Sequence, residues 1–180
     1  MMHGFAAYWL GDTTASDQGR LSLNPLKHID PFMTVLLPIV TIVLFGFPFL
    51  AAKPVPFNPA RLKFDEFGAA MVAAAGPFSN LILAFAAALL LRLTGGNFMY
   101  GFLSVFTVIN VALFVFNLIP IPPLDGSRVL YAFAPEPLQK VMASMETYGL
   151  FIIFGVILLF GNGFSTILVH LENNVLNILP

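Results

Sequence analysis

Residues 110–128 read NVALFVFNLIPIPPLDGSR, and this stretch decides how the rest of the chain is interpreted. Its apolar first half predicts a membrane helix. Pro120, Pro122 and Pro123 then end that helix, because proline lacks the backbone N–H and clashes with the preceding turn. Asp125 is therefore predicted to lie where a membrane helix breaks. A carboxylate at that depth costs about 3 kcal/mol on insertion scales, so we expect it to have a cationic or metal partner.

The composition is that of a membrane protein. Hydrophobic residues make up 58% of the 180 residues and charged residues 9%, against about 25% charged residues in soluble domains. Four windows contain no Asp, Glu, Lys or Arg, and each is long enough to cross a hydrocarbon core, which takes about 20 residues: 31–52, 67–91, 93–124 and 147–171. The net charge of −1 gives no reason to expect nucleic acid as a partner, and the absence of cysteine excludes thiolate metal sites.

We therefore predict an all-α fold, a polytopic membrane helix bundle of three to four spans in the cell membrane, with residues 1–180 as a single domain. Window 31–52 is interrupted by prolines and a glycine, and it is consistent with a kinked span or with a re-entrant segment. The polar, proline-bounded stretches 19–30 and 53–60 are expected to form a small extended or β-like hairpin.

The histidines give the first indication of a metal site. Residues 1–10, MMHGFAAYWL, are predicted to be the end of a helix that a glycine–aspartate pair stops, and they carry His3. His28 is interpreted as a hydrogen-bonding loop residue and His170 as a structural residue at the end of a span. Histidine and carboxylate together form a ligand pair suited to zinc, which makes His3 and Asp125 candidate ligands.

The sequence also allows two interpretations from other functional classes. Residues 58–61 contain the Asn-Pro-Ala signature of aquaporin-like pores, but those proteins need two half-helix motifs related by internal symmetry. This sequence has one such motif and no internal repeat, so a channel is disfavoured. A non-enzymatic membrane scaffold is the stronger alternative, and it would tolerate Asp125→Asn, whereas a zinc protease would not.

Several motifs together resemble the site-2 protease family, the intramembrane zinc metalloproteases, of the compact prokaryotic type. HGFAAYWLGD (3–12) is similar to the continuation of that family's HExxH helix, with His3 as the second histidine. The remaining similar segments follow in the family's order: the loops GRLSLNPLKHIDP (19–31) and AKPVPFNP (52–59), the small-residue helix motif AAGPFSN (74–80) and the aspartate motif NLIPIPPLDGSRVL (117–130).

The resemblance implies a Zn²⁺ ion held by two histidines and by Asp125, with the glutamate of HExxH as general base on the metal-bound water. Asn80 and Asn117 match amide positions that orient the substrate backbone or the ligands, and interhelical hydrogen bonding is the alternative role for both. The implied function is intramembrane proteolysis of the transmembrane segments of membrane proteins. The implied partners are a substrate helix and the lipid bilayer, and the sequence sets no oligomeric state.

The chain departs from the family at the HExxH motif. With His3 as the second histidine, the first histidine and the glutamate would precede Met1, so no catalytic base is present among the 180 residues. We expect the chain to be N-terminally incomplete; a natural non-catalytic protein that binds membrane partners is the alternative. In either case the 180-residue chain alone is expected not to hydrolyse peptides.

Overall fold

The computed structural model describes residues 1–19, 21–22, 36–45, 58–93 and 98–180. These residues form two compact units, Met1–Lys63 and Phe64–Pro180, and each unit is described by itself. Every regular element in the described ranges is a helix, which confirms the predicted all-α class. The hairpin expected over 19–30 and 53–60 falls mainly outside the described residues, as does His28.

The first unit contains α1 (Met2–Trp9), α2 (Thr14–Asp17), α3 (Leu37–Phe45) and the short 3₁₀ helix η3 (Pro59–Arg61). No side-chain cap is present at the start of α1. Gly11 follows the helix with a φ of +104°, a conformation that glycine adopts without steric cost. The predicted helix end before the glycine–aspartate pair is therefore confirmed. α3 is the described part of window 31–52, and the course of the remainder lies outside the described residues.

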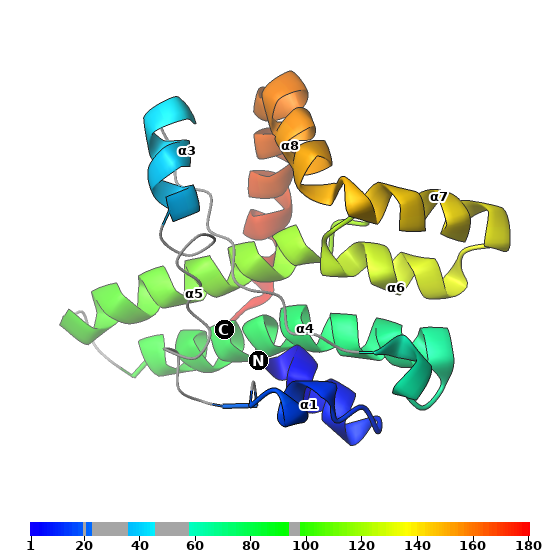
Figure 1. Cartoon of the computed structure of the whole chain (residues 1–180). Coiled ribbons are helices and arrows are strands. Elements are labelled where there is room, and N and C mark those ends of the chain that lie inside the picture. Colours follow the sequence, from blue (N-terminus) through cyan, green and yellow to red (C-terminus); the bar gives the residue numbers. More distant parts are fainter. Residues whose placement is uncertain (20, 23–35, 46–57, 94–97) are drawn as a thin grey trace. The chain divides into compact units, whose positions relative to one another are not determined.

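In the second unit the described residues form α4 (Asp65–Leu91), α5 (Phe98–Asn117), α6 (Asp125–Phe133), α7 (Glu136–Thr147) and α8 (Gly149–Ile178). α4 packs against α5 and α6, α7 packs against α6, and α8 packs against α5 (Figure 1). Ala84, Val111 and Val115 form the buried centre of the α4–α5–α8 contact.

Two of the described helices are long and apolar enough to cross a membrane, Asp65–Leu91 and Met99–Asn117. A third span in this part of the chain requires Glu136–Thr147 and Phe151–Gly161 to count as one bent segment, with an angle of 90° between them. The sequence predicts three to four spans. On length and composition the described residues therefore supply two, or three with the bent pair.

Small residues allow α4 to approach its neighbours closely. Its buried positions are mostly glycine and alanine, including Gly68, Ala73 and Ala84, as is typical of helix contacts in membranes. The outward face is apolar as well: Ile82 is 68% exposed and Phe85 is 52% exposed. A helix with an inner face of small residues and an outer face of large apolar ones is suited to lipid on its outer side.

α8 is interrupted within its length. Phe160 has non-helical dihedral angles, φ −124° and ψ 16°, directly before the Gly161-Asn162-Gly163 sequence that predicts a break. The second half of α8 supplies Leu168 and Val175 to the hydrophobic cluster around Val111. The break therefore separates the part of α8 that packs on this cluster from the part that follows α7.

Candidate functional site

The loop that carries Asp125 is held by backbone hydrogen bonds. α5 ends at Asn117, and the N–H of Ile121 then donates to the carbonyl of Ile119 at 2.8 Å. The N–H of Leu124 donates to the carbonyl of Ile121 at 2.9 Å, and α6 begins at the next residue, Asp125. The prolines thus end the span, as the sequence predicts, and the structure shows that the chain turns directly into a second helix, α6.

Gly126 allows this turn to be tight. A Cβ atom at position 126 would lie 2.1 Å from the carbonyl oxygen of Leu118 and 2.7 Å from that of Ile119. Both neighbours are backbone atoms, so no side-chain rotation could relieve the overlap. The first turn of α6 is therefore packed against the end of α5 as closely as a glycine permits, and this contact fixes where Asp125 begins its helix.

Asp125 is half-buried in the first turn of α6. The N-terminus of a helix carries partial positive charge from its unpaired N–H groups, which favours a carboxylate at this position. The neighbouring Ser127 is buried, and its hydroxyl donates to the carbonyl of Leu124 at 2.7 Å. Asp125 is thus a carboxylate on a rigid helix start, held next to the end of a membrane span.

His3, in the first turn of α1, is half-buried. α1 is tied to the 58–63 segment of its own unit through Asp12, whose side chain is fully buried. Asp12 accepts the N–H of Asn58 at 2.6 Å, and it also accepts both the N–H and the hydroxyl of Thr14. A further bond runs from the N–H of Lys63 to the carbonyl of Leu10 at 2.8 Å. The helix that carries His3 therefore has a fixed attachment at its C-terminal end.

Burial alone would raise the pKa of Asp12, but the accepted hydrogen bonds outweigh it. The hydroxyl of Thr14, the N–H groups of Asn58 and Thr14, and the nearby positive charge of Arg61 all favour the ionised carboxylate. The pKa of Asp12 is therefore lowered from its ordinary value. Asp12 acts as a charged hydrogen-bond acceptor inside the first unit.

The two candidate zinc ligands belong to different units, His3 to Met1–Lys63 and Asp125 to Phe64–Pro180. Within the described residues, no group of three or more His, Cys, Asp or Glu side chains is placed to hold a metal ion. Imidazole and carboxylate are donors that zinc accepts. In donor chemistry these two side chains therefore fit zinc, and their role as its ligands remains a prediction.

The two amides singled out in the sequence lie on neighbouring helices. Asn117 donates from Nδ2 to the carbonyl of Leu113 at 2.9 Å, a bond within α5 itself. Asn80 is half-buried in α4, two residues after Phe78, which meets Phe114 of α5 edge to face with ring centroids 6.0 Å apart. The bond of Asn117 thus lies within its own helix, and both the substrate role and the interhelical role of the two amides remain predictions.

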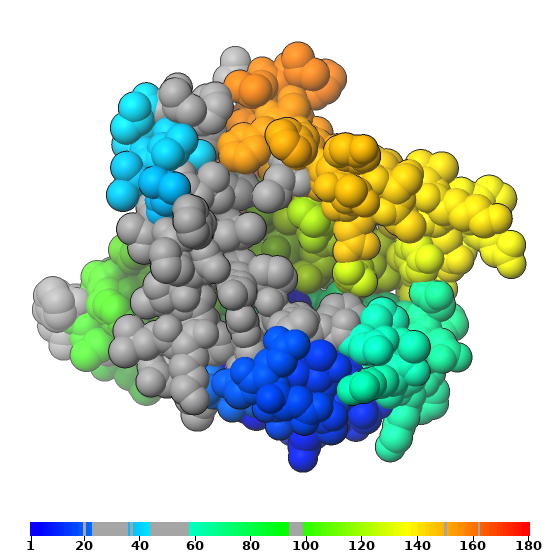
Figure 2. Space-filling view, viewed as in Figure 1, coloured from blue at the N-terminus to red at the C-terminus, as the bar shows by residue number. Residues whose placement is uncertain are grey.

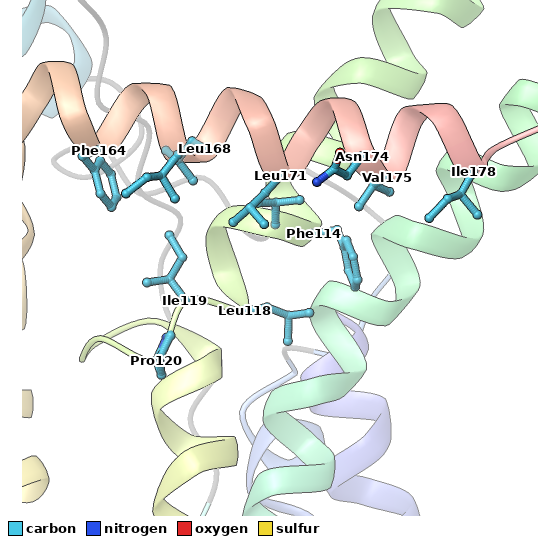
Figure 3. A pocket seen from close by; sticks show the side chains of 12 residues that line it. Phe114, Leu118, Ile119, Pro120, Phe164, Leu168, Leu171, Asn174, Val175 and Ile178 are labelled. Atoms are coloured by element: carbon cyan, nitrogen blue, oxygen red, sulfur yellow. The ribbon is translucent and has the colours of Figure 1, made fainter.

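A cavity of about 550 Å³ opens beside the aspartate loop (Figure 3). One wall is formed by the end of α5 and the loop after it, with Phe114, Leu118, Ile119 and Pro120. The opposite wall is formed by α8, with Leu168, Leu171, Val175 and Ile178. Asn174 supplies an amide to an otherwise apolar lining. A cavity of this size and polarity is suited to an apolar ligand or side chains, with few polar anchors.

Sequence reasoning missed three features of the site. The first is the buried Asp12 and its bond to Asn58: the sequence indicates Asp12 only as part of the glycine–aspartate pair that ends a helix. The need for glycine at 126 depends on the carbonyl of Leu118, and the α8 wall of the cavity depends on how α8 packs. Neither of the last two features has a signal in the local sequence.

Comparison with known proteins identifies similar chains. Residues 94–161 match peptidase family M50. The chain is 41% identical over 170 residues to "Putative zinc metalloprotease YwhC" of Bacillus subtilis, covering 87% of this chain and 73% of that protein. It is 33% identical over 160 residues to "Putative zinc metalloprotease Rip2" of Mycolicibacterium smegmatis, covering 84% of this chain and 58% of that protein. No solved structure matches the chain.

The Rip2 protein of Mycobacterium tuberculosis is 28% identical over 156 residues, which is 82% of this chain and 57% of that relative. The chain thus spans somewhat more than half the length of the Rip2 proteins and about three quarters of YwhC.

Proposed function

The chain belongs to peptidase family M50, the site-2 protease family, and we propose that it is a zinc metalloendopeptidase that cleaves the transmembrane segments of membrane proteins. The observation that supports this most is the 41% identity to "Putative zinc metalloprotease YwhC" over 87% of the chain. The apolar helices α4 and α5 make it a membrane protein. We further propose that it is a multi-pass protein of the cell membrane.

In this proposal Asp125 and His3 are metal ligands. Zinc bound there would lower the pKa of its bound water and polarise the substrate carbonyl. Gly126 and the loop hydrogen bonds hold Asp125 at the end of the α5 span. The 180 residues contain no HExxH sequence, so they supply neither the first histidine nor the glutamate of that motif. We therefore expect the 180-residue polypeptide alone to be inactive.

The substrate is proposed to be the helix of a single-span membrane protein, locally unwound. The apolar wall of the α5–α8 cavity would receive its side chains, since this cavity adjoins the loop that ends in Asp125. Asn80 and Asn117 are proposed to bind the substrate backbone or to orient the ligands. With a net charge of −1, the chain gives no reason to propose a nucleic acid as a partner.

The test is a cleavage assay with the natural full-length protein, purified from its own membranes and reconstituted into liposomes with a single-span substrate. Mass spectrometry of the products should place the cut inside the membrane segment. Asp125→Asn should abolish the cut. Asp65→Asn, at the first residue of α4, is the matched control and should retain it.

Full activity in Asp125→Asn would refute the role of this residue. A natural chain that binds a membrane protein without cleaving it would favour the scaffold alternative.

A further inference from the structure

The start of α8 lies directly against the loop that leads into Asp125. A Cβ atom built on Gly149 would lie 2.6 Å from Cδ of Pro123 and 2.8 Å from its Cβ and Cγ. Ordinary van der Waals contact begins at 3.4 Å, so any side chain at 149 would have to displace Pro123 or α8 by several tenths of an ångström. Pro123 is two residues before Asp125, so this contact packs the start of α8 against the loop that leads into the candidate ligand.

The α6–α7 hairpin returns the chain to this point. Arg128, in the first turn of α6, pairs with Glu146 near the end of α7. Farther along the hairpin, Nε2 of Gln139 donates to the carbonyl of Tyr131 at 3.0 Å. The space-filling view shows α6 and α7 as one continuous surface that leads into the first turns of α8 (Figure 2). The position of Gly149 beside Pro123 is therefore consistent with the pairing of the two preceding helices.

The next turns of α8 extend the same contact. Ile153 is 4% exposed and, with Val156, borders a small gap that Ile121 and Leu124 close on the side of the loop. Positions 149, 153 and 156 follow the helical spacing that places residues on one face. One face of α8 therefore lies along the loop between Ile121 and Leu124.

We propose that Gly149 is a positioning residue for Asp125. The lack of a side chain at 149 allows α8 to lie against the ring of Pro123, and this contact sets the position of the loop from which α6 and Asp125 begin. Only Leu124 separates Pro123 from Asp125 in the sequence, and the N–H of Leu124 is bonded to the carbonyl of Ile121. The functional meaning of this proposal rests on the proposed role of Asp125 as a ligand.

The first test needs no metal. The chain contains no cysteine, so Asp125→Cys introduces a single thiol whose maleimide labelling rate reports the surroundings of position 125. In this background we expect Gly149→Ala to change the rate by about tenfold, since thiol reactivity follows exposure and local charge. Gly155→Ala is the matched control, because a Cβ there meets nothing within 4 Å, and it should leave the rate within about twofold.

Restoration by a second change separates positioning from general damage. Pro123→Gly removes every ring atom that a Cβ at 149 would meet. Adding it to Gly149→Ala should return the labelling rate to that of Pro123→Gly alone, as a double-mutant cycle requires for a direct contact. An unchanged rate in Gly149→Ala would overturn the proposal. So would an equal change in Gly155→Ala, or a defect, including failure to fold, that Pro123→Gly does not restore.

The second test measures Zn²⁺ affinity in the natural full-length protein with Asp125 intact. Gly149→Ala should weaken binding by about 10- to 100-fold, the effect usual for groups that orient a ligand, and Pro123→Gly should reverse the loss. A natural protein that binds no zinc would refute the proposed function while the labelling result still decides the role of Gly149. Unaltered zinc affinity in Gly149→Ala would overturn the positioning role.

Discussion

Asp12→Asn removes the charge that attaches α1, and with it His3, to the 58–63 segment. The carboxylate accepts three hydrogen bonds from Thr14 and Asn58. An asparagine oxygen can accept the two bonds from Thr14, but its NH₂ group would then face the N–H of Asn58. One bond to a charged group is lost and one buried donor is left unpaired, which should destabilise this attachment by about 2–3 kcal/mol.

The effect should depend on pH in a defined direction. The pKa of Asp12 is lowered by folding, relative to an ordinary value of 3.8, so ionisation favours the folded state. The stabilisation is complete above pH 3.8, and it is lost as the pH falls from there through the folded-state pKa. The difference in stability between the natural chain and Asp12→Asn should therefore be largest at neutral pH and should shrink as the pH falls below 3.8.

Hydrogen–deuterium exchange of the chain in lipid nanodiscs measures this directly. Amides in α1 and at Asn58 and Lys63 should exchange about 30-fold faster in Asp12→Asn, the factor that corresponds to 2 kcal/mol. Asp17→Asn is the matched control, because Asp17 accepts an exposed bond from Thr13 at 2.9 Å that an asparagine oxygen can also accept. Equal exchange in the two variants would refute the account of Asp12.

Two further substitutions test the second unit. Gly126→Ala should lower the free energy of unfolding in detergent by about 3 kcal/mol, because its Cβ would overlap the backbone of Leu118; a stability equal to that of the natural protein would contradict the close packing of α6 on α5. In the natural full-length protein, Leu168→Trp, which narrows the α5–α8 cavity, should raise KM for a membrane substrate about tenfold with little change in kcat. Val169→Trp on the exposed side of α8 serves as its control, and an equal KM in both would contradict the substrate role of the cavity.

Local patterns predict the parts of this fold that depend on local physics. The charge-free windows predict the α4 and α5 spans, and the prolines after Asn117 predict where the second span ends. The glycine–aspartate pair predicts the end of α1, and the glycines at 161 and 163 predict the break beside Phe160. In each case neighbouring residues determine the backbone preference or the length of the hydrophobic segment.

Features that depend on contacts between distant residues could not be predicted in this way. Gly149 has no local signal of its own, because its importance comes from a proline 26 positions earlier that the α6–α7 hairpin brings beside it. The bond between Asp12 and Asn58 joins residues 46 positions apart. The sequence indicates Asp125 as a candidate ligand through its position after a broken span and through the family resemblance. The close packing of Gly126 against the end of α5, next to Asp125, is visible only in the structure.

The most direct test of the central claim is the zinc content of the natural full-length protein and of its Asp125→Asn variant, measured by mass spectrometry of the metal after purification without added zinc. The account predicts about one zinc ion per chain in the natural protein and in Asp65→Asn, and a clear loss in Asp125→Asn. Equal zinc in Asp125→Asn and in the natural protein would show that Asp125 is not a ligand. A natural protein without zinc would contradict the metalloprotease assignment itself.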